Sequence, residues 1–203
     1  MIKLPGYSLY RCDRVGRSGG GVAFDLSDHL RASIFCSSSE SVTVKPEFIV
    51  AEILFNDLSK LLLAVVYRPP NSGFLNEFFQ SYSELQVNYR HLILGDFNAD
   101  MNQTTFESQQ LSSFISASSL YLVPFTSTHH LRNSSTLLDL CIIDDADISS
   151  RNMVNGAAFL SAHDLIYIRY GIKLQRRRGK LVVCRDWRDL DAASFQSDIG
   201  DIY

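Results

Sequence analysis

The chain has 203 residues, of which 46% are hydrophobic, and its formal net charge is −3. This composition excludes a disordered or fibrous protein and supports one domain with a core of ordinary size, with or without a tail. No apolar run approaches the roughly 18 residues that a membrane span needs, and the start of the chain lacks the apolar core of a signal peptide. We therefore expect an intracellular protein that is not inserted in a membrane. Its four cysteines form no Cys-x-x-Cys pair, so a zinc site is not expected.

The first half of the chain predicts strands and turns. Three glycines at 19–21 precede an apolar stretch and indicate a turn that leads into a strand over 22–24. A second short strand is expected over 31–35. The apolar runs 48–55 and 61–67 flank a turn-forming segment, so they predict a hairpin. The second run is almost continuously apolar, which indicates burial on both faces.

The second half alternates helices with strands. Apolar residues recur at steps of three and four over 74–89, which predicts an amphipathic helix, and a second helix is expected over 106–120. Apolar strands are expected over 91–94, 137–143 and 165–172. This order predicts an α/β fold, with a mixed sheet covered by helices or with two sheets packed together.

The composition changes after about residue 175. A basic cluster is followed by acidic and polar residues without a clear period; the cluster comprises Arg176, Arg177, Arg178 and Lys180. Such a run is either a solvated linker or a local binding patch for nucleic acid. We treat 1–175 as the domain and 176–203 as a linker that leads out of it.

The segment Gly95-Asp96-Phe97-Asn98 directly follows the apolar strand over 91–94. It has two interpretations. Asp96 and Asn98 can form an Asx turn that ends the strand. Alternatively, an acid and an amide two positions apart at a strand end can point together into an active site.

Three other places put polar residues at the ends of predicted strands. Each has a plain explanation, such as a packed tyrosine, a surface arginine, a capping acid or a loop histidine. Together, however, a phenol, a guanidinium, acids, an amide and an imidazole are the groups that cleave a phosphate ester with a divalent metal. The three places are Tyr67-Arg68, Asp139 within 135–140, and Ser161-Ala162-His163-Asp164.

The ordered set of motifs resembles the endonuclease/exonuclease/phosphatase superfamily. It is most similar to the apurinic-type endonuclease domain of insect-type non-LTR retrotransposons, and the similarity extends over essentially the whole chain. The motifs are Tyr67-Arg68-Pro69-Pro70, Gly95-Asp96-Phe97-Asn98, 135–140 and Ser161-Ala162-His163, with support from 19–23 and from Arg185-Asp186-Trp187.

The resemblance implies a two-sheet, four-layer α/β sandwich that lacks its first strands, with the site at the rim of the sheets. It implies Mg²⁺-dependent or Mn²⁺-dependent hydrolysis of a DNA phosphodiester, which nicks target DNA and leaves a 3′-hydroxyl primer. The substrate phosphate would lie against Tyr67 and Arg68. The chain would be a monomer, normally fused to a reverse transcriptase, and the parent element would act in the nucleus.

The resemblance also implies a role for each polar residue of the site. Asp96 would align or deprotonate the attacking water and is a possible metal ligand. Asn98 would hydrogen-bond the phosphate or the nucleophile. His163 would bind the scissile phosphate, and Asp139 would orient that imidazole.

Two departures from the family pattern bear on activity. Members of the family begin with a strand that carries an Asn and a second strand that ends in the main metal-binding Glu, whereas this sequence starts at the segment matching Pro5-Gly6-Tyr7. Glu40, Glu47 and Glu52 do not lie where they could substitute for that residue.

The second departure is Ala162, which stands where the family usually has an Asp. Asp164 would face the same side of an extended segment, but two residues span about 6.6 Å along a strand, whereas a bond from Mg²⁺ to oxygen is about 2.1 Å. We therefore expect Asp164 to be a surface or capping acid and not a metal ligand.

These losses predict impaired activity and a chain of marginal stability, because a sheet without its first strand exposes an edge. Two alternatives keep the same motifs. One is a non-catalytic nucleic-acid-binding remnant that uses Arg68 and the basic cluster, and the other is a phosphatase-type member of the superfamily.

Overall fold

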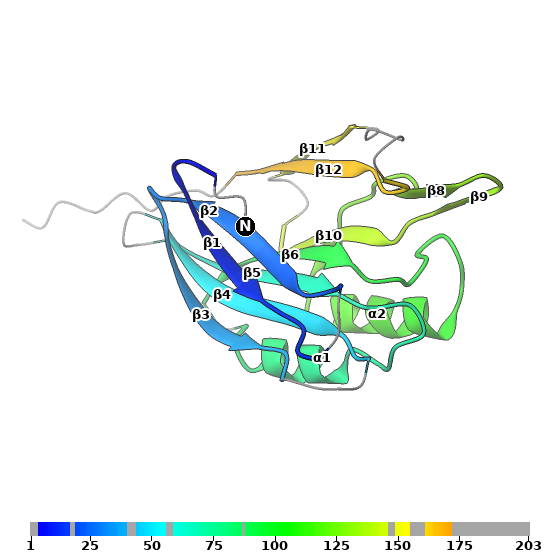
Figure 1. The fold of residues 1–203 in the computed structure, drawn as a ribbon, viewed down its shortest axis with the longest axis horizontal. Coiled ribbons are helices and arrows are strands. Elements are labelled where there is room, and N and C mark those ends of the chain that lie inside the picture. Colours follow the sequence, from blue (N-terminus) through cyan, green and yellow to red (C-terminus); the bar gives the residue numbers. More distant parts are fainter. Residues whose placement is uncertain are drawn as a thin grey trace, which may run out of the picture.

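A six-stranded sheet forms the centre of the fold (Figure 1). In the computed structural model, residues 4–16, 19–39, 44–55, 59–86, 88–145, 149–154 and 161–171 are described. In spatial order the strands are β3 (Arg31–Ser37), β4 (Glu47–Phe55), β5 (Ser59–Tyr67), β6 (Arg90–Asp96), β10 (Asp139–Ile143) and β7 (Tyr121–Leu122). β5 and β6 are parallel, and the other neighbours are antiparallel.

The predicted hairpin is confirmed by β4 and β5. Their register runs from Glu47 opposite Tyr67 to Phe55 opposite Ser59. Alternate residues of β5 are buried in two different clusters, with Ala64 in one and Leu63 in the other. Burial on both faces explains why the run is almost continuously apolar.

Two helices cover one face of this sheet (Figure 1). They are α1 (Asn76–Ser83) and α2 (Phe106–Ala117). Phe78 and Tyr82 of α1 and Leu111 of α2 are almost completely buried against the sheet. Both helices are shorter than their apolar patterns predict. After α1 the chain must turn before the parallel strand β6 begins, and Asn88 takes a left-handed conformation with φ of 72° in that turn.

A second layer of strands covers part of the opposite face (Figure 1). It contains the antiparallel pairs β1 (Tyr7–Cys12) with β2 (Val22–Ser27), and β11 (Ser149–Val154) with β12 (Leu165–Tyr170). Phe24 and Leu26 of β2 pack against a buried cluster that includes Ile53 and Leu63. The tertiary structure is therefore a mixed α/β fold with a helical layer, a six-stranded sheet and further strands.

Several short strands were not predicted from the sequence. They include β1, β7, β11 and the hairpin of β8 (His129–Leu131) with β9 (Ser134–Thr136). These segments have no clear alternation of apolar and polar residues, and β1, β7, β8 and β9 bury little of their surface. The basic cluster and the predicted linker lie outside the described residues. In the described part of the chain, no helix has the length and apolar character that a membrane crossing requires.

Candidate active site

The register of the central sheet aligns polar residues of four neighbouring strands in one row. Glu47 is opposite Tyr67, Tyr67 is next to Asp96, and Asp96 is opposite Asp139. Residues in register on neighbouring strands project from the same face of a sheet. Val66, which precedes Tyr67, is buried on the helical side, so the row lies on the opposite face. Residues from three distant parts of the sequence thus meet at one end of the sheet.

Asp96 ends β6 and is held by the turn that follows it. Its Oδ1 accepts a hydrogen bond from the backbone N–H of Asn98 at 3.0 Å, and its Oδ2 accepts one from the Asn98 side-chain amide at 3.2 Å. The same amide donates to the Arg68 carbonyl oxygen at 2.7 Å. The Asx turn expected for this segment is therefore present, and it orients the Asp96 carboxylate at the strand end. Since Asn98 uses its amide hydrogens within the protein, its placement favours orientation of Asp96 over a direct phosphate contact.

Arg68, which the resemblance places against the substrate phosphate, has a buried side chain. The residue is only 6% exposed, and its guanidinium donates to the carbonyl oxygens of Gly73, Asn98 and Ser72 at 3.0 to 3.3 Å. Arg68 is therefore not a surface charge, and its guanidinium is hydrogen-bonded within the protein. It instead joins the turn after β5 to the turn after β6, so Tyr67 alone of this pair remains in the row.

Asp139 of the row contacts His163, which lies on a distant segment. His163 Nδ1 and Asp139 Oδ2 are 2.8 Å apart. The backbone N–H of Asp139 donates to the Thr128 hydroxyl at 2.9 Å, and Thr128 is fully buried. Asp139 is thus fixed through both its backbone and its carboxylate, and the expected pairing with His163 is present.

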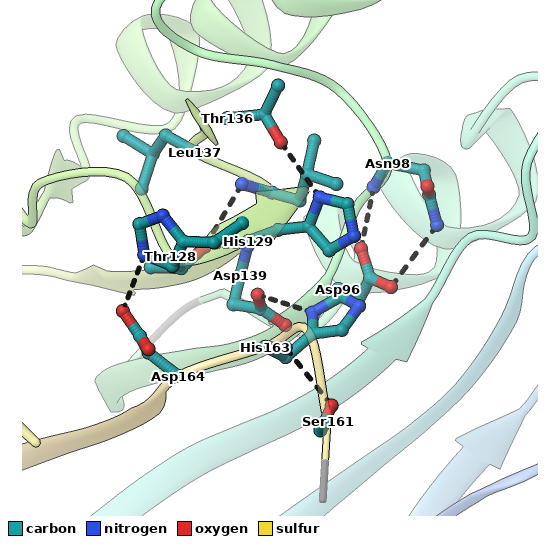
Figure 2. Close-up of polar contacts among 12 residues, drawn as sticks. Asp96, Asn98, Thr128, His129, Thr136, Leu137, Asp139, Ser161, His163 and Asp164 are labelled. Carbon is teal, nitrogen blue, oxygen red and sulfur yellow. Dashed lines mark hydrogen bonds and ion pairs between the residues drawn. The ribbon is translucent and has the colours of Figure 1, made fainter. Parts of the chain in front are cut away.

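The segment that carries His163 lies beside β8. A β-bridge pairs His129 with His163 and brings their ring centroids to 4.6 Å (Figure 2). His129 Nδ1 is also 3.2 Å from the Thr136 hydroxyl. Figure 2 shows the two imidazoles beside the carboxylates of Asp96 and Asp139. The site therefore contains a second imidazole that sequence reasoning did not identify.

Asp164 does not reach this group of carboxylates. Its Oδ2 is 2.9 Å from His130 Nε2, and its side chain is only 8% exposed. The expectation that Asp164 lies away from a metal site agrees with this placement. It is not a surface acid, however, because its carboxylate is buried against His130. Ala162 accepts a hydrogen bond from the His130 backbone N–H through its carbonyl oxygen.

The environment raises the pKa of Asp96 above its ordinary value. Burial is the main cause, because it disfavours the charged carboxylate, and the nearby Asp139 carboxylate raises the pKa further. The Asn98 backbone N–H, His163 and His129 act in the opposite direction. A partly buried acid with a raised pKa beside a second acid is typical of functional sites.

Three side chains could contribute to holding a divalent cation. Asp96, Asp139 and His163 each offer one donor atom, and these atoms lie within 4.8 Å of one another. Carboxylate oxygens suit Mg²⁺ or Mn²⁺, whereas an imidazole is not a preferred ligand of Mg²⁺. The group therefore fits a cation held chiefly by Asp96 and Asp139, with other positions left for water and substrate oxygens.

The glutamates considered from the sequence are engaged elsewhere or not described. Glu47 belongs to the row, but its carboxylate binds Arg14 Nε at 2.5 Å and the Gly21 backbone N–H at 2.7 Å. Glu52 pairs with Lys60 at 2.8 Å on the same strand pair. Glu40 lies outside the described residues.

Several supporting residues were missed by sequence reasoning. Thr128 holds the backbone of Asp139, and Asp100 Oδ1 accepts from the backbone N–H of Leu137 at 2.9 Å. His129 and His130 both lie on β8, one facing each side of the strand. The two adjacent histidines were the available sequence signal for these residues. A short polar strand, however, does not indicate which residues its side chains will contact.

Comparisons with known proteins agree with this fold. The family model described as endonuclease-reverse transcriptase matches residues 61–167. Among solved structures, the chain is similar to the endonuclease domain of TRAS1, a telomere-specific non-LTR retrotransposon, with a TM-score of 0.64 and 13% identity. That match covers 81% of this chain and 78% of the TRAS1 domain.

Two bacterial structures also share the fold. An endonuclease/exonuclease/phosphatase family protein from Leptotrichia buccalis C-1013-b has a TM-score of 0.54 and 12% identity, over 82% of this chain and 72% of that one. A functionally unknown conserved protein from Enterococcus faecalis V583 has a TM-score of 0.52 and 12% identity, over 81% and 77%. The comparison with curated proteins gives no match. Because the family model matches more than half of the chain, the chain belongs to the endonuclease-reverse transcriptase family.

Proposed function

We propose that this domain hydrolyses a phosphodiester bond of DNA and so introduces a nick. The observation that carries this proposal is the row of Tyr67, Asp96 and Asp139, closed by the 2.8 Å contact between Asp139 and His163. The row combines an acid with a raised pKa, a phenol and an imidazole bound to a second acid. This is the set of groups that aligns a water and binds the oxygens of a phosphate.

Asp96 is the group that we expect to align the attacking water and to accept its proton. A base works best when its pKa lies nearer the working pH, and burial moves the pKa of Asp96 in that direction. Asn98 would support this role by fixing both carboxylate oxygens. A fixed carboxylate needs no reorganisation when the water approaches.

His163 is expected to contact a non-bridging oxygen of the scissile phosphate. Asp139 engages Nδ1, so the second ring nitrogen is left for the substrate. When both nitrogens carry protons, Nε2 donates to the oxygen on which negative charge develops. Tyr67, the neighbour of Asp96 on β5, would place its hydroxyl against the same phosphate.

The resemblance implies a divalent cation, and the donor atoms present fit one. Mg²⁺ or Mn²⁺ bound by Asp96 and Asp139 would neutralise phosphate oxygens and favour ionisation of a water. We expect a low rate, because Glu47, the next carboxylate along the row, is engaged by Arg14 and is not available as a further ligand.

We infer that the domain is joined to a reverse transcriptase in the parent element, acts on target DNA in the nucleus and leaves a 3′-hydroxyl for priming. The family description, endonuclease-reverse transcriptase, supports the link to a reverse transcriptase.

A plasmid-nicking assay tests the proposal. Supercoiled plasmid is incubated with the protein and Mg²⁺ or Mn²⁺, with or without chelator, and the relaxed form is quantified. We expect chelator to abolish nicking. We expect Asp96→Asn and His163→Ala to lower the rate by roughly 10²–10⁴-fold, the usual contribution of a positioned acid or base.

Matched controls come from exposed residues of the same types. Asp25 on β2 and His29 in the turn after it are both exposed, so Asp25→Asn and His29→Ala should leave the rate unchanged. Equal nicking by all five proteins would assign the activity to a contaminant. DNA binding that survives chelator without any nicking would instead identify a non-catalytic binding module.

A further inference from the structure

The segment 161–164 is attached to the rest of the site through β8. The His130 backbone N–H donates to the Ala162 carbonyl oxygen at 2.8 Å, and the Asp164 backbone N–H donates to the Thr128 carbonyl oxygen at 2.7 Å. The other edge of β8 pairs with β9. The segment therefore continues a small antiparallel arrangement, in which successive residues face opposite sides.

One side of this arrangement belongs to the site described above, where His129 meets His163. The other side holds a different pair, His130 and Asp164, whose Nε2 and Oδ2 atoms are 2.9 Å apart. His130 Nδ1 is also 3.1 Å from the Ser135 hydroxyl on β9. Side chains thus link β9, β8 and the His163 segment on the side away from the carboxylates.

The exposure of the two partners differs strongly. The Asp164 side chain is 8% exposed, whereas that of His130 is 45% exposed. A carboxylate removed from water requires hydrogen-bonding partners. Asp164 therefore restrains the segment 161–164 to positions in which its carboxylate can bind such partners. His130 supplies one from a strand whose other edge is already paired.

We propose that Asp164 and His130 are positioning residues that hold the segment 161–164 so that His163 Nδ1 stays against Asp139. The inference rests on the proposed function, because it assigns the pair a part in the same reaction. Asp164 is next to His163 in the chain, so a displacement of one moves the other. Misplacement of a reacting group by about 1 Å lowers a rate by up to about 100-fold.

The experiment combines kinetics with a spectroscopic readout. Asp164→Ala, His130→Ala and His130→Gln are compared with wild type in plasmid nicking, with kcat and KM measured separately. The His163 ring N–H proton bound to Asp139 is observed by proton NMR, with Asp139→Asn used to assign it. His29→Ala serves as the matched histidine control.

We expect both alanine variants to lower kcat by roughly 10–100-fold with little change in KM, the range found when supporting partners of a site are removed. The His163 ring N–H signal should broaden or disappear in both. His130→Gln can still donate to Asp164, so it should recover much of kcat and of the signal. The loss in the double alanine variant should be smaller than the sum of the two single losses, because each single variant already removes the contact between the two residues.

An unchanged His163 signal and an unchanged kcat in the alanine variants would overturn the proposal. A weakened response to Mn²⁺ with an intact His163 signal would also overturn it, because Asp164 would then act on the cation. If Asp164→Ala does not fold, the His130 pair of variants decides the question, since His130 is largely exposed. If wild type does not nick DNA, the proposed function fails, while the NMR signal still decides whether the pair positions His163.

Discussion

Replacing Thr128 by valine removes a buried hydroxyl on which the site depends. Thr128 is fully buried, and its Oγ1 accepts hydrogen bonds from the backbone N–H groups of Leu138 at 3.2 Å and Asp139 at 2.9 Å. Valine has nearly the same shape but no acceptor. Two backbone donors would therefore lose their partner without a compensating change in volume.

The expected loss of stability follows from those two donors. An orphaned buried donor costs about 1–3 kcal/mol, and Leu138 and Asp139 are partly accessible, which favours the lower part of this range. For two donors we expect the free energy of unfolding to fall by roughly 2–4 kcal/mol. In a chain of this size, that change lowers the melting temperature by roughly 5–15 °C.

Urea denaturation followed by circular dichroism measures this change. Thr104→Val is the matched control, because Thr104 is exposed, and it should change the free energy of unfolding by less than about 0.5 kcal/mol. Nicking by Thr128→Val should also fall, since Asp139 loses its backbone anchor. If Thr128→Val were as stable as the control, the Thr128 hydroxyl could not be what holds Asp139.

Other predictions test Gly95, Arg68 and Asp96. A methyl group at Gly95 would meet the Val66 carbonyl oxygen on β5, so Gly95→Ala should lower the free energy of unfolding by roughly 1–3 kcal/mol in urea denaturation. Gly73→Ala is the control and should be nearly neutral, because a methyl group at Gly73 meets no atom within 4 Å. Arg68→Lys should lower the free energy of unfolding by about 1–3 kcal/mol without changing the salt dependence of DNA binding. If the slope of the logarithm of the binding constant against the logarithm of salt concentration fell in magnitude by about one, Arg68 would instead be a phosphate contact. Carboxyl NMR should show Asp96 titrating above its ordinary value of 3.8, and Asp139→Asn should lower that pKa; an unshifted midpoint would contradict the burial argument. Because the folded-state pKa is raised, the stability contribution of Asp96 is present in full below its unfolded pKa and is lost as the pH rises through the folded pKa.

The strands and helices with strong local patterns could be predicted from the sequence. The runs at 48–55 and 61–67 correspond to β4 and β5, and the helical spacing after residue 74 corresponds to α1. These elements bury much of their apolar surface, which leaves a recognisable pattern in the sequence. The pattern is a continuous apolar run for strands buried on both faces and a helical period for α1. The strands β1 and β8 bury little and leave no such pattern, so the sequence does not predict them.

The supporting contacts of the site could not be predicted, because they join residues that are far apart in the chain. Thr128 and Asp139 are separated by 11 positions, and His130 and Asp164 by 34. No local pattern encodes which strand edge a polar residue will meet. Arg68 shows the same limit, since its orientation depends on carbonyl oxygens of two separate turns.

The sequence by itself determined the family, the order of the motifs and the residues with reactive side chains, because these depend on residue identity and local spacing. Only the tertiary structure decided which of those residues meet. The register of β4, β5, β6 and β10 aligned Tyr67, Asp96 and Asp139, and the pairing at β8 brought His163 to Asp139. It also turned Arg68 and Asp164 away from the row, because each buried charge had to reach partners supplied by distant segments.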